Sequence, residues 1–353
     1  MKKILINFIV AVASVLAEAE VLFPDPSIYQ ENGTYYLIGT ENSPQEIRKF
    51  SKDKKMYPLM ISKNGVDWQR YDEKGERLAC IKMEESKGKA HFWAPQIFKH
   101  NNRYYLAYSS NLVSGKDSDL KYMRCMIAST DKIENGFKDA VVLDTDAGEI
   151  DPFIFIDDDG TPYAFLVRWQ NRGGIWVQKL SKDFKTRIGK PKNCIINSEP
   201  WEKTPLTPEF LAINQKRKQE NPKISHWELF NTSDGVNEGP TVIKRGGKYV
   251  LFYSANDFRS PFYCVGYAVA DNPFGEWKKA SAPVLSRENT GLNGIGHGDI
   301  FFDKNGEMWY VFHAHHSNIR VSPRRTGVIK LIETFDKNGN PSYKADYSTM
   351  RLL

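Results

Sequence analysis

The sequence predicts an all-β protein, a five-bladed β-propeller, chiefly because one structural unit recurs five times along its 353 residues. Each copy has a polar start, an apolar strand, a tight turn with Gly or Asn, and an aromatic-rich strand. Further short strands follow every copy. Five units of about four strands each favour blades that pack face to face around a central channel. A β-sandwich or a β-barrel is the alternative architecture.

Each copy has the pattern of a β-hairpin. β-branched and aromatic residues alternate on both arms, and the turns ENG, HNN, DDDG, RGG and KNG contain residues that tolerate a positive φ. In chain order the copies are DPSIYQENGTYYLIGT from Asp25, APQIFKHNNRYYLAYS from Ala94, DPFIFIDDDGTPYAFLV from Asp151, EGPTVIKRGGKYVLFYS from Glu238 and HGDIFFDKNGEMWYVFH from His297. The strands expected after them are PLMISKNGVDWQRY, KYMRCMIAST, GGIWVQKLSKDF, YCVGYAVADNPFGEW and RRTGVIKLIETF.

Prolines stand at the start of four of the five hairpins, namely Pro26, Pro95, Pro152 and Pro240. Proline cannot donate to a strand ladder, so these hairpins are expected to begin on the innermost strand of each blade, which is an edge. A residue that precedes proline is expected to be extended. The residues just ahead of the prolines should then line one mouth of the channel. They are Asp25, Trp93-Ala94, Asp151 and Glu238-Gly239, with His297-Gly298-Asp299 in the fifth copy.

The chain is expected to be one domain behind a signal peptide. Residues 1–19 have a basic start, an apolar run and a small-x-small end, which are typical of a secretory signal. A membrane anchor is the alternative, but the apolar run is shorter than the roughly 20 residues that span a bilayer. We therefore expect a propeller over residues 20–353, no membrane span, and export to the periplasm or the medium.

Charge and cysteine content exclude other classes. The net charge is only +6, and no stripe alternates basic residues with aromatic ones, so no nucleic-acid partner is expected. The four cysteines are too far apart in sequence for a compact zinc knuckle. Three disulfide pairings are formally possible in an oxidising compartment, but four buried thiols are favoured. The cysteines are Cys80, Cys125, Cys194 and Cys264.

Three carboxylates stand at the starts of three repeats. Radial packing of blades would bring Asp25, Asp151 and Glu238 to equivalent, neighbouring positions, although they are far apart in sequence. Hydrolysis of a glycosidic bond needs one protonated and one ionised carboxyl group. A third carboxylate can keep the pKa of the acid high. The alternative is that each acid only caps a strand or turn.

The ordered motifs DPSI, FWAPQIF, EIDPFIF, NEGPTV and GHGDIFF resemble glycoside hydrolase family 43, the five-bladed-propeller arabinofuranosidases, xylosidases and arabinanases. The resemblance extends from about Phe23 to near the C-terminus. It implies that Asp25 is the general base, that Asp151 modulates pKa and positions the acid, and that Glu238 is the general acid. It also implies inversion of the anomeric configuration, for which carboxyl groups stand about 6.5 to 9.5 Å apart.

The resemblance implies a carbohydrate substrate, with α-L-arabinofuranose as the favoured sugar in plant polysaccharides or oligosaccharides. A β-xylosidase and a β-galactofuranosidase are the alternatives within the family. Sucrose- and fructan-cleaving propellers are disfavoured because Asn, Arg and Cys are missing from the places where their NDPNG, RDP and EC motifs require them. A sugar-binding propeller without catalysis is the alternative from another class.

Four further residues are candidates for substrate binding. Trp93 would offer a flat apolar face to a sugar at the channel mouth. Arg168 and Trp169 follow the return strand of the third hairpin, where loops face the pocket or its rim. His297 resembles the family's channel histidine, which in many members lies near a calcium ion and its waters. No cofactor is required, and a calcium ion in the channel, near His297, is a candidate.

Two other segments carry hypotheses. The run HAHHS contains His313, His315 and His316, but alternate side chains on a strand diverge, so zinc catalysis is disfavoured. The longest interval between repeats, from the third to the fourth, predicts a short helix from Glu209 to Gln219. Long excursions in compact domains are often functional. We therefore expect this one to wall the pocket near Glu238, with Trp227 touching substrate.

Overall fold

The computed structural model describes residues 20–40, 54–114, 120–143, 145, 147–168, 174–232 and 235–353. The predicted signal peptide, residues 1–19, lies outside the described residues.

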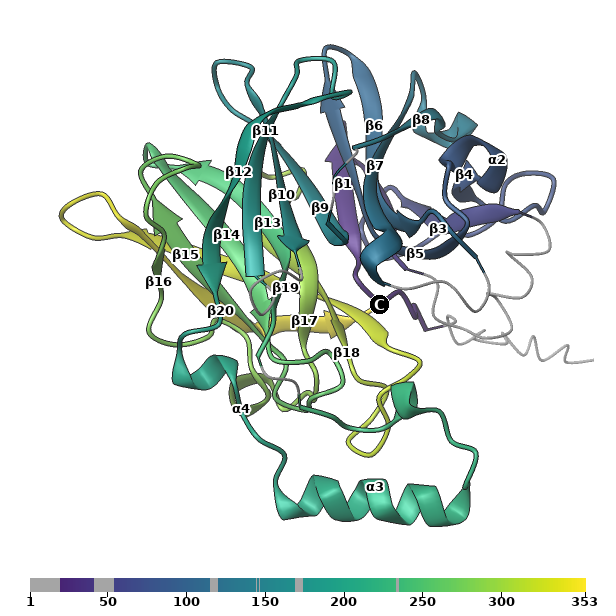
Figure 1. Cartoon of the computed structure of the whole chain (residues 1–353), viewed down its shortest axis with the longest axis vertical. Helices are drawn as coiled ribbons and strands as arrows, with labels where there is room; N and C mark the ends of the chain where they lie inside the picture. Colours follow the sequence, from purple (N-terminus) through teal and green to yellow (C-terminus); the bar gives the residue numbers. More distant parts are fainter. Residues whose placement is uncertain are drawn as a thin grey trace, which may run out of the picture.

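The described chain forms five four-stranded antiparallel sheets, each with its strands in chain order (Figure 1). The sheets are β1 (Ser27–Glu31), β2 (Thr34–Ile38), β3 (Lys55–Ser62) and β4 (Ala79–Lys82); β5 (Ala90–His100), β6 (Arg103–Asn111), β7 (Met123–Thr130) and β8 (Lys138–Val142); β9 (Glu149–Ile156), β10 (Pro162–Arg168), β11 (Gly174–Leu180) and β12 (Arg187–Ile196); β13 (Asn237–Arg245), β14 (Lys248–Ala255), β15 (Cys264–Ala270) and β16 (Lys278–Lys279); and β17 (Gly296–Phe302), β18 (Met308–Ala314), β19 (Arg325–Phe335) and β20 (Pro341–Leu352).

The first strand of each sheet is the innermost. β1, β5, β9, β13 and β17 contact one another in a closed ring, in which β1 meets both β5 and β17. The other strands of each sheet follow outward in sequence order. The predicted five-bladed propeller is therefore confirmed, as is the innermost position of the strands that carry the prolines.

The hydrophobic core lies between neighbouring blades. On β10, Phe165 and Val167 pack toward the fourth blade, whereas Ala164 and Leu166 pack toward the second. Three further clusters fill the other junctions between neighbouring blades. Successive side chains of a strand point to opposite faces, so a blade buried on both faces needs apolar residues at odd and even positions alike. This requirement explains the near-continuous apolar runs of the second strands.

The residues before β1 bind the fifth blade. The Val21 amide donates to the carbonyl of Leu353 at 2.8 Å, and the Thr326 amide donates to the carbonyl of Val21 at 2.9 Å. The Phe23 amide donates to the hydroxyl of Thr326 at 2.9 Å. These bonds close the ring between the first and fifth blades. They also bring Asp25 beside the loop that joins β18 to β19.

The two ends of the ring differ. All inner strands run in one direction, so their first residues share one end, which we term the mouth. The turns within the five hairpins share the other end, which we term the hairpin face. Connections between blades return to the mouth, and they include α2 (Met83–Ser86), α3 (Pro208–Glu220) and α4 (Arg287–Thr290). The predicted helix over 209–219 is confirmed as α3, which stands apart from the sheets at the bottom of Figure 1.

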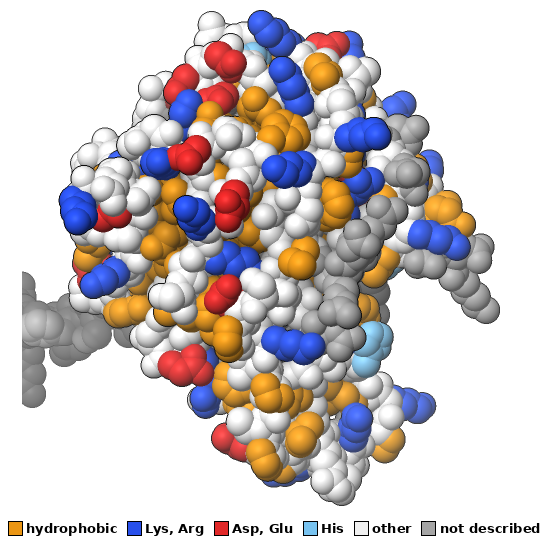
Figure 2. Space-filling view, turned by 60° about the vertical axis from the view of Figure 1, so that its left-hand side comes forward, with side chains coloured by type: hydrophobic (Ala, Val, Ile, Leu, Met, Phe, Trp, Pro, Cys, Tyr) orange, Lys and Arg blue, Asp and Glu red, His pale blue; other side chains and the backbone are white. Residues whose placement is uncertain are grey.

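The other expectations concern the surface and the cysteines. Within the described ranges, no helix combines the length and apolarity that a bilayer crossing requires. The four cysteines are free, and three of them are buried as expected, whereas Cys194 is only partly buried. On the face shown in Figure 2, basic and acidic side chains are interspersed rather than gathered into a stripe.

Candidate active site

One residue on every inner strand, or just before it, has a left-handed backbone. The φ angles are 51° at Asp25, 45° at Ala94, 55° at Asp151, 59° at Gly239 and 38° at His297. The prediction that residues before proline are extended is therefore wrong at Asp25, Ala94, Asp151 and Gly239. In β5, β9, β13 and β17 the pairing register shifts at this point, as in a β-bulge. Bulges re-aim side chains and are common next to active sites.

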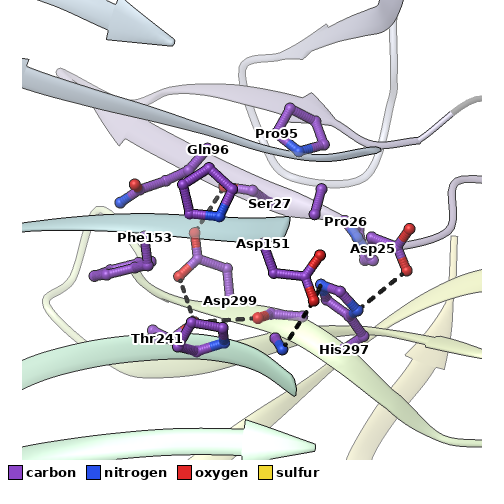
Figure 3. A pocket seen from close by; sticks show the side chains of 15 residues that line it. Asp25, Pro26, Ser27, Pro95, Gln96, Asp151, Phe153, Thr241, His297 and Asp299 are labelled. Carbon is purple, nitrogen blue, oxygen red and sulfur yellow. Dashed lines mark hydrogen bonds and ion pairs between the residues drawn. The ribbon is translucent and has the colours of Figure 1, made fainter. Parts of the chain in front are cut away.

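The five left-handed positions surround a narrow hollow on the ring axis (Figure 3). Its volume is about 30 Å³, which is room for one or two waters. Each inner strand contributes three consecutive residues to its lining: 25–27, 94–96, 151–153, 239–241 and 297–299. A left-handed non-glycine residue costs roughly 1–3 kcal/mol, so strain repeated around one hollow points to a functional site.

Asp25 is buried and held in its ionised form. Its Oδ1 atom lies 3.0 Å from Nη1 of Arg324 and 3.4 Å from Nδ1 of His297. Its backbone amide donates to Nδ1 of His313 at 3.1 Å. Burial on its own raises the pKa of Asp25, but Arg324, with smaller contributions from the two histidines, outweighs it and leaves the pKa well below 3.8.

Arg324 is the cation that stabilises the ionised form of Asp25. Burial lowers the pKa of His297, and burial together with Arg324 lowers the pKa of His313 to about 3. Both imidazoles are therefore neutral at pH 7, and their attraction for a carboxylate is weak. Arginine side chains are charged throughout the ordinary pH range, so Arg324, 3.0 Å from Asp25, is the group that holds Asp25 ionised.

Asp151 is buried in the opposite electrostatic setting. Its Oδ2 atom accepts a hydrogen bond from the Gly239 amide at 3.3 Å, and its own amide donates to the Ser109 hydroxyl at 3.2 Å. Burial raises the pKa of Asp151 well above 3.8, and repulsion from Glu238 and Asp25 adds to the effect. Asp151 and Glu238 repel one another, so the pair tends to retain a proton.

Glu238 has the pKa of a general acid at neutral pH. Burial raises its pKa to about 7, against the hydrogen bond that the Tyr263 hydroxyl donates to Oε1 at 2.7 Å. Nearby Asp257 and Asp25 raise the pKa further, whereas Arg324 lowers it. A carboxyl group with this pKa is protonated in about half of the molecules at pH 7 and can donate a proton.

The predicted equivalence of the three acids needs one correction. Asp25 and Asp151 occupy the left-handed position, but in the fourth blade this position is taken by Gly239, and Glu238 stands one residue earlier, paired with Ser254. A Cβ atom at Gly239 would lie 2.8 Å from Cδ2 of His297, closer than such contacts allow. The imidazole therefore excludes a carboxylate from position 239.

His297 lies between the two aspartates. Its Nε2 atom is 3.9 Å from Oδ2 of Asp151, while its Nδ1 atom faces Asp25, as the sticks in Figure 3 show. The candidate calcium ion would need about six to eight oxygen ligands. His297 offers nitrogen, and the carboxylate of Asp299 already accepts from Ser27 at 2.7 Å and from Thr241 at 3.2 Å. Within the described ranges, no three His, Cys, Asp or Glu residues converge to hold a metal. The described channel residues do not fit direct calcium coordination.

Comparison with known proteins identifies the family. The profile described as Glycosyl hydrolases family 43 matches residues 19–341. The chain belongs to this family.

Its relatives carry several activities in their names. The extracellular exo-alpha-(1->5)-L-arabinofuranosidase of Streptomyces avermitilis is 26% identical over 90% of this chain and 61% of the relative. Xylosidase/arabinosidase 43B of Humicola insolens is 22% identical over 82% of this chain and 46% of the relative. The chain thus spans about half to three-fifths of these curated relatives.

Solved structures agree on the fold. A structure described as an endo-1,4-beta-xylanase from Bacteroides thetaiotaomicron VPI-5482 superposes with a TM-score of 0.69 at 27% identity and covers 92% of this chain and 95% of that chain. A thermostable family-43 glycoside hydrolase also has a TM-score of 0.69, at 29% identity, with 92% of both chains covered.

The other predicted site residues of this family 43 chain are placed less centrally. Trp93 is partly buried against the core cluster of blades three and four, and its ring lies 5.1 Å from that of His91. Arg168 is buried, and its Nε atom lies 3.1 Å from Oε1 of the fully buried Glu149. Trp169 lies outside the described residues. Sugar binding by Trp93, Arg168 and Trp169 stays a prediction.

Three residues of the site were not predicted from sequence as partners of the acids. His313 entered the sequence analysis only as a disfavoured metal ligand, yet Nδ1 of its ring accepts a hydrogen bond from the Asp25 amide. Tyr263 and Arg324 lie in loops at the mouth, and Arg324 reaches Asp25 across 299 positions of sequence. A histidine near the end of the aromatic strand of the fifth repeat was the available signal for His313. Loop residues such as Arg324 carry no periodic signal at all.

Proposed function

We propose that this family 43 chain is an inverting glycoside hydrolase that releases α-L-arabinofuranose from plant polysaccharides or oligosaccharides. The observation that carries the proposal is the opposite electrostatic setting of two buried carboxyl groups at one mouth: Arg324 lies 3.0 Å from Asp25, whereas burial dominates at Glu238. The pKa of Asp25 is held well below 3.8, whereas the pKa of Glu238 is raised to about 7. Glycosidases need such a pair.

The proposed reaction uses each carboxyl group once. Asp25 accepts a proton from a water whose oxygen attacks the anomeric carbon, while Glu238 donates its proton to the departing glycosidic oxygen. Asp151 repels the ionised form of Glu238 and so favours the protonated acid. Direct attack by water inverts the anomeric centre and forms no covalent intermediate. Solvent then removes the proton from Asp25 and returns one to Glu238.

The choice of sugar is supported by the relatives rather than by a pocket shape. Curated relatives are named for arabinofuranosidase, xylosidase and galactofuranosidase activities. A β-xylosidase and a β-galactofuranosidase therefore remain the competing assignments. Export is proposed from the signal-like residues 1–19 and from relatives named as extracellular. A channel calcium ion would have to be held through waters, and its test is the thermal midpoint with and without a chelator.

The test is a sugar panel. The purified chain is assayed on 4-nitrophenyl α-L-arabinofuranoside, β-D-xyloside and β-D-galactofuranoside, and on arabinan and arabinoxylan, with Glu238→Gln as the inactive control. Release of arabinose, with the inverted anomer seen first by NMR, is the expected result. If the wild type binds these glycans but turns none of them over, the chain is instead a sugar-binding propeller.

A further inference from the structure

The α3 excursion is tied to the mouth by a small core of its own. Phe210 of α3 packs edge-on to Phe230 at 5.0 Å and to Phe262 at 5.7 Å between ring centroids. Val321, from the loop that also carries Arg324, completes this cluster. These contacts connect three separate loops at the mouth: the α3 excursion, the β14–β15 loop and the β18–β19 loop. The excursion is therefore anchored beside the acids.

Trp227, in this excursion, has an exposed aromatic ring that neighbouring side chains hold in place. Half of the side chain is exposed, at 50%, although the ring stacks on Phe258 with centroids 6.0 Å apart and planes 17° apart. The guanidinium of Arg259 lies 5.0 Å from the Trp227 ring centroid. Arg259 is itself fixed by Asp257, with contacts of 3.0 and 2.8 Å. The His226 ring also lies against Trp227, with centroids 4.4 Å apart, so neighbours fix the position of a ring that is half exposed. An aromatic ring that is fixed and exposed can bind the apolar face of a ligand.

Contacts connect this ring to both reacting carboxyl groups. Phe258, under Trp227, has the guanidinium of Arg324 at 4.5 Å from its ring centroid, and Arg324 holds Asp25. On the other side, Asp257 lies near enough to Glu238 to raise the pKa of that acid. The Trp227 ring is thus separated from the catalytic base by two intervening side chains. The ring therefore lies outside the side chains that contact Asp25 directly, on the side where a sugar beyond the cleaved one would extend.

We propose that Trp227, backed by Phe258 and flanked by Arg259, forms a leaving-group subsite that stacks on a pyranose ring next to the scissile bond. The inference rests on the proposed function and narrows its substrate class. A pyranose with equatorial hydroxyl groups offers a flat face of axial C–H groups to an aromatic ring, which a puckered furanose does not. The guanidinium of Arg259, 5.0 Å from the Trp227 ring centroid, adds a charged hydrogen-bond donor beside that ring. The expected substrate is a sugar released from a pyranose backbone, such as xylan, rather than from an all-furanose arabinan.

The test compares substrates with and without the next sugar. We use methyl α-L-arabinofuranoside and an arabinosylated xylo-oligosaccharide, or the matching xylosides if the panel shows xylose release; aryl glycosides are avoided because their ring could also stack on Trp227. For Trp227→Ala, the ratio of kcat/KM on the oligosaccharide to kcat/KM on the methyl glycoside should fall on the order of tenfold. Trp227→Phe should keep most of that ratio.

The control variant is Tyr347→Ala on β20, since Tyr347 is similarly exposed, at 44%, but lies on the outermost strand of the fifth blade. Tyr347→Ala should leave the ratio unchanged. Equal losses on both substrates in Trp227→Ala, or no loss, would overturn the subsite. A wild type that hydrolyses nothing would overturn the proposed function instead.

Binding can be read without turnover. Calorimetric titration of xylotetraose into Glu238→Gln and into Glu238→Gln/Trp227→Ala tests the platform by itself, and the expected result is a roughly tenfold weaker Kd for the double variant. Equal affinities would contradict the proposal.

Discussion

The mouth and the hairpin face are built from the same five repeats, yet they use left-handed backbone differently. In the five hairpin turns the left-handed residues are all Asn or Gly, which tolerate positive φ at low cost: Asn32, Gly33, Asn101, Asn102, Gly160, Gly246, Gly247 and Gly306. At the mouth the equivalent backbone is occupied by Asp25, Ala94, Asp151 and His297, with glycine only at 239.

The difference separates a folding requirement from a functional one. A hairpin turn needs only the backbone conformation, so the residue with the smallest strain serves best. At Asp25, Asp151 and His297 the conformation re-aims a side chain toward the axis, so a strained residue persists where its carboxylate or imidazole is needed, a reason that does not apply to Ala94. Strain that is retained next to a hollow is therefore a better guide to the site than strain in a turn.

The largest expected effect comes from removing the two reacting carboxyl groups. Glu238→Gln and Asp25→Asn should each lower kcat about 10³- to 10⁴-fold, because each removes one proton transfer. Circular dichroism should show an unchanged fold. A 2,4-dinitrophenyl leaving group needs no acid, so it should restore much of the rate to Glu238→Gln but not to Asp25→Asn. Equal behaviour of the two variants would refute their assigned roles.

Asp151→Asn should lower kcat about 100-fold and change the pH profile. In the wild type, activity should decline as pH rises through about 7, where Glu238 loses its proton. Removing the like charge makes ionisation of Glu238 easier, so the alkaline limb should move to lower pH. The measurement is kcat/KM from pH 4 to 9. An alkaline limb that stays in place would show that Asp151 acts by position alone.

Gly239 at the mouth and Gly33 on the hairpin face both have a positive φ, so the same substitution can be compared at the two ends of the ring. Gly239→Ala places a Cβ atom against His297, so activity should fall roughly tenfold or more as the imidazole is displaced from between the aspartates. Gly33→Ala meets no atom within 4 Å and suffers only the positive φ of 75°. It should cost about 1 kcal/mol of unfolding free energy, with little change in activity. Denaturant titration and kcat/KM of both variants test the contrast, which disappears if both lose activity equally.

The smallest effect on the maximal rate, severalfold, is expected for Arg324→Met. Without the guanidinium, burial dominates and the pKa of Asp25 rises toward or above its ordinary value. The base is then protonated at a higher pH, so the acid limb of kcat/KM should move up by about one unit or more. Arg324→Lys should retain part of the wild-type profile. An unchanged acid limb would mean that other groups hold Asp25 ionised.

The repeats, the inner strands and the position of the three acids at one end of the ring were predicted from the sequence, because these features depend on local patterns. Alternating apolar residues, turn residues and prolines each act within a few positions of the chain. The prediction failed at the backbone of Asp25 and Asp151, which was expected to be extended. At Asp151 a bulge against the partner strand overrides this preference, and at Asp25 the contacts with the fifth blade do so; the preference of a single residue reveals neither.

The sequence by itself determined the five hairpins, the blades that bury both faces, the helix of the excursion and the identity of the carboxylates. Only the tertiary structure decided which carboxylate is ionised and which is protonated. That choice depends on burial and on Arg324, His297, Tyr263 and Asp257, which meet the acids through the closure of the ring. Electrostatic interactions act through space, and neighbours that lie hundreds of residues away leave no local mark in the sequence.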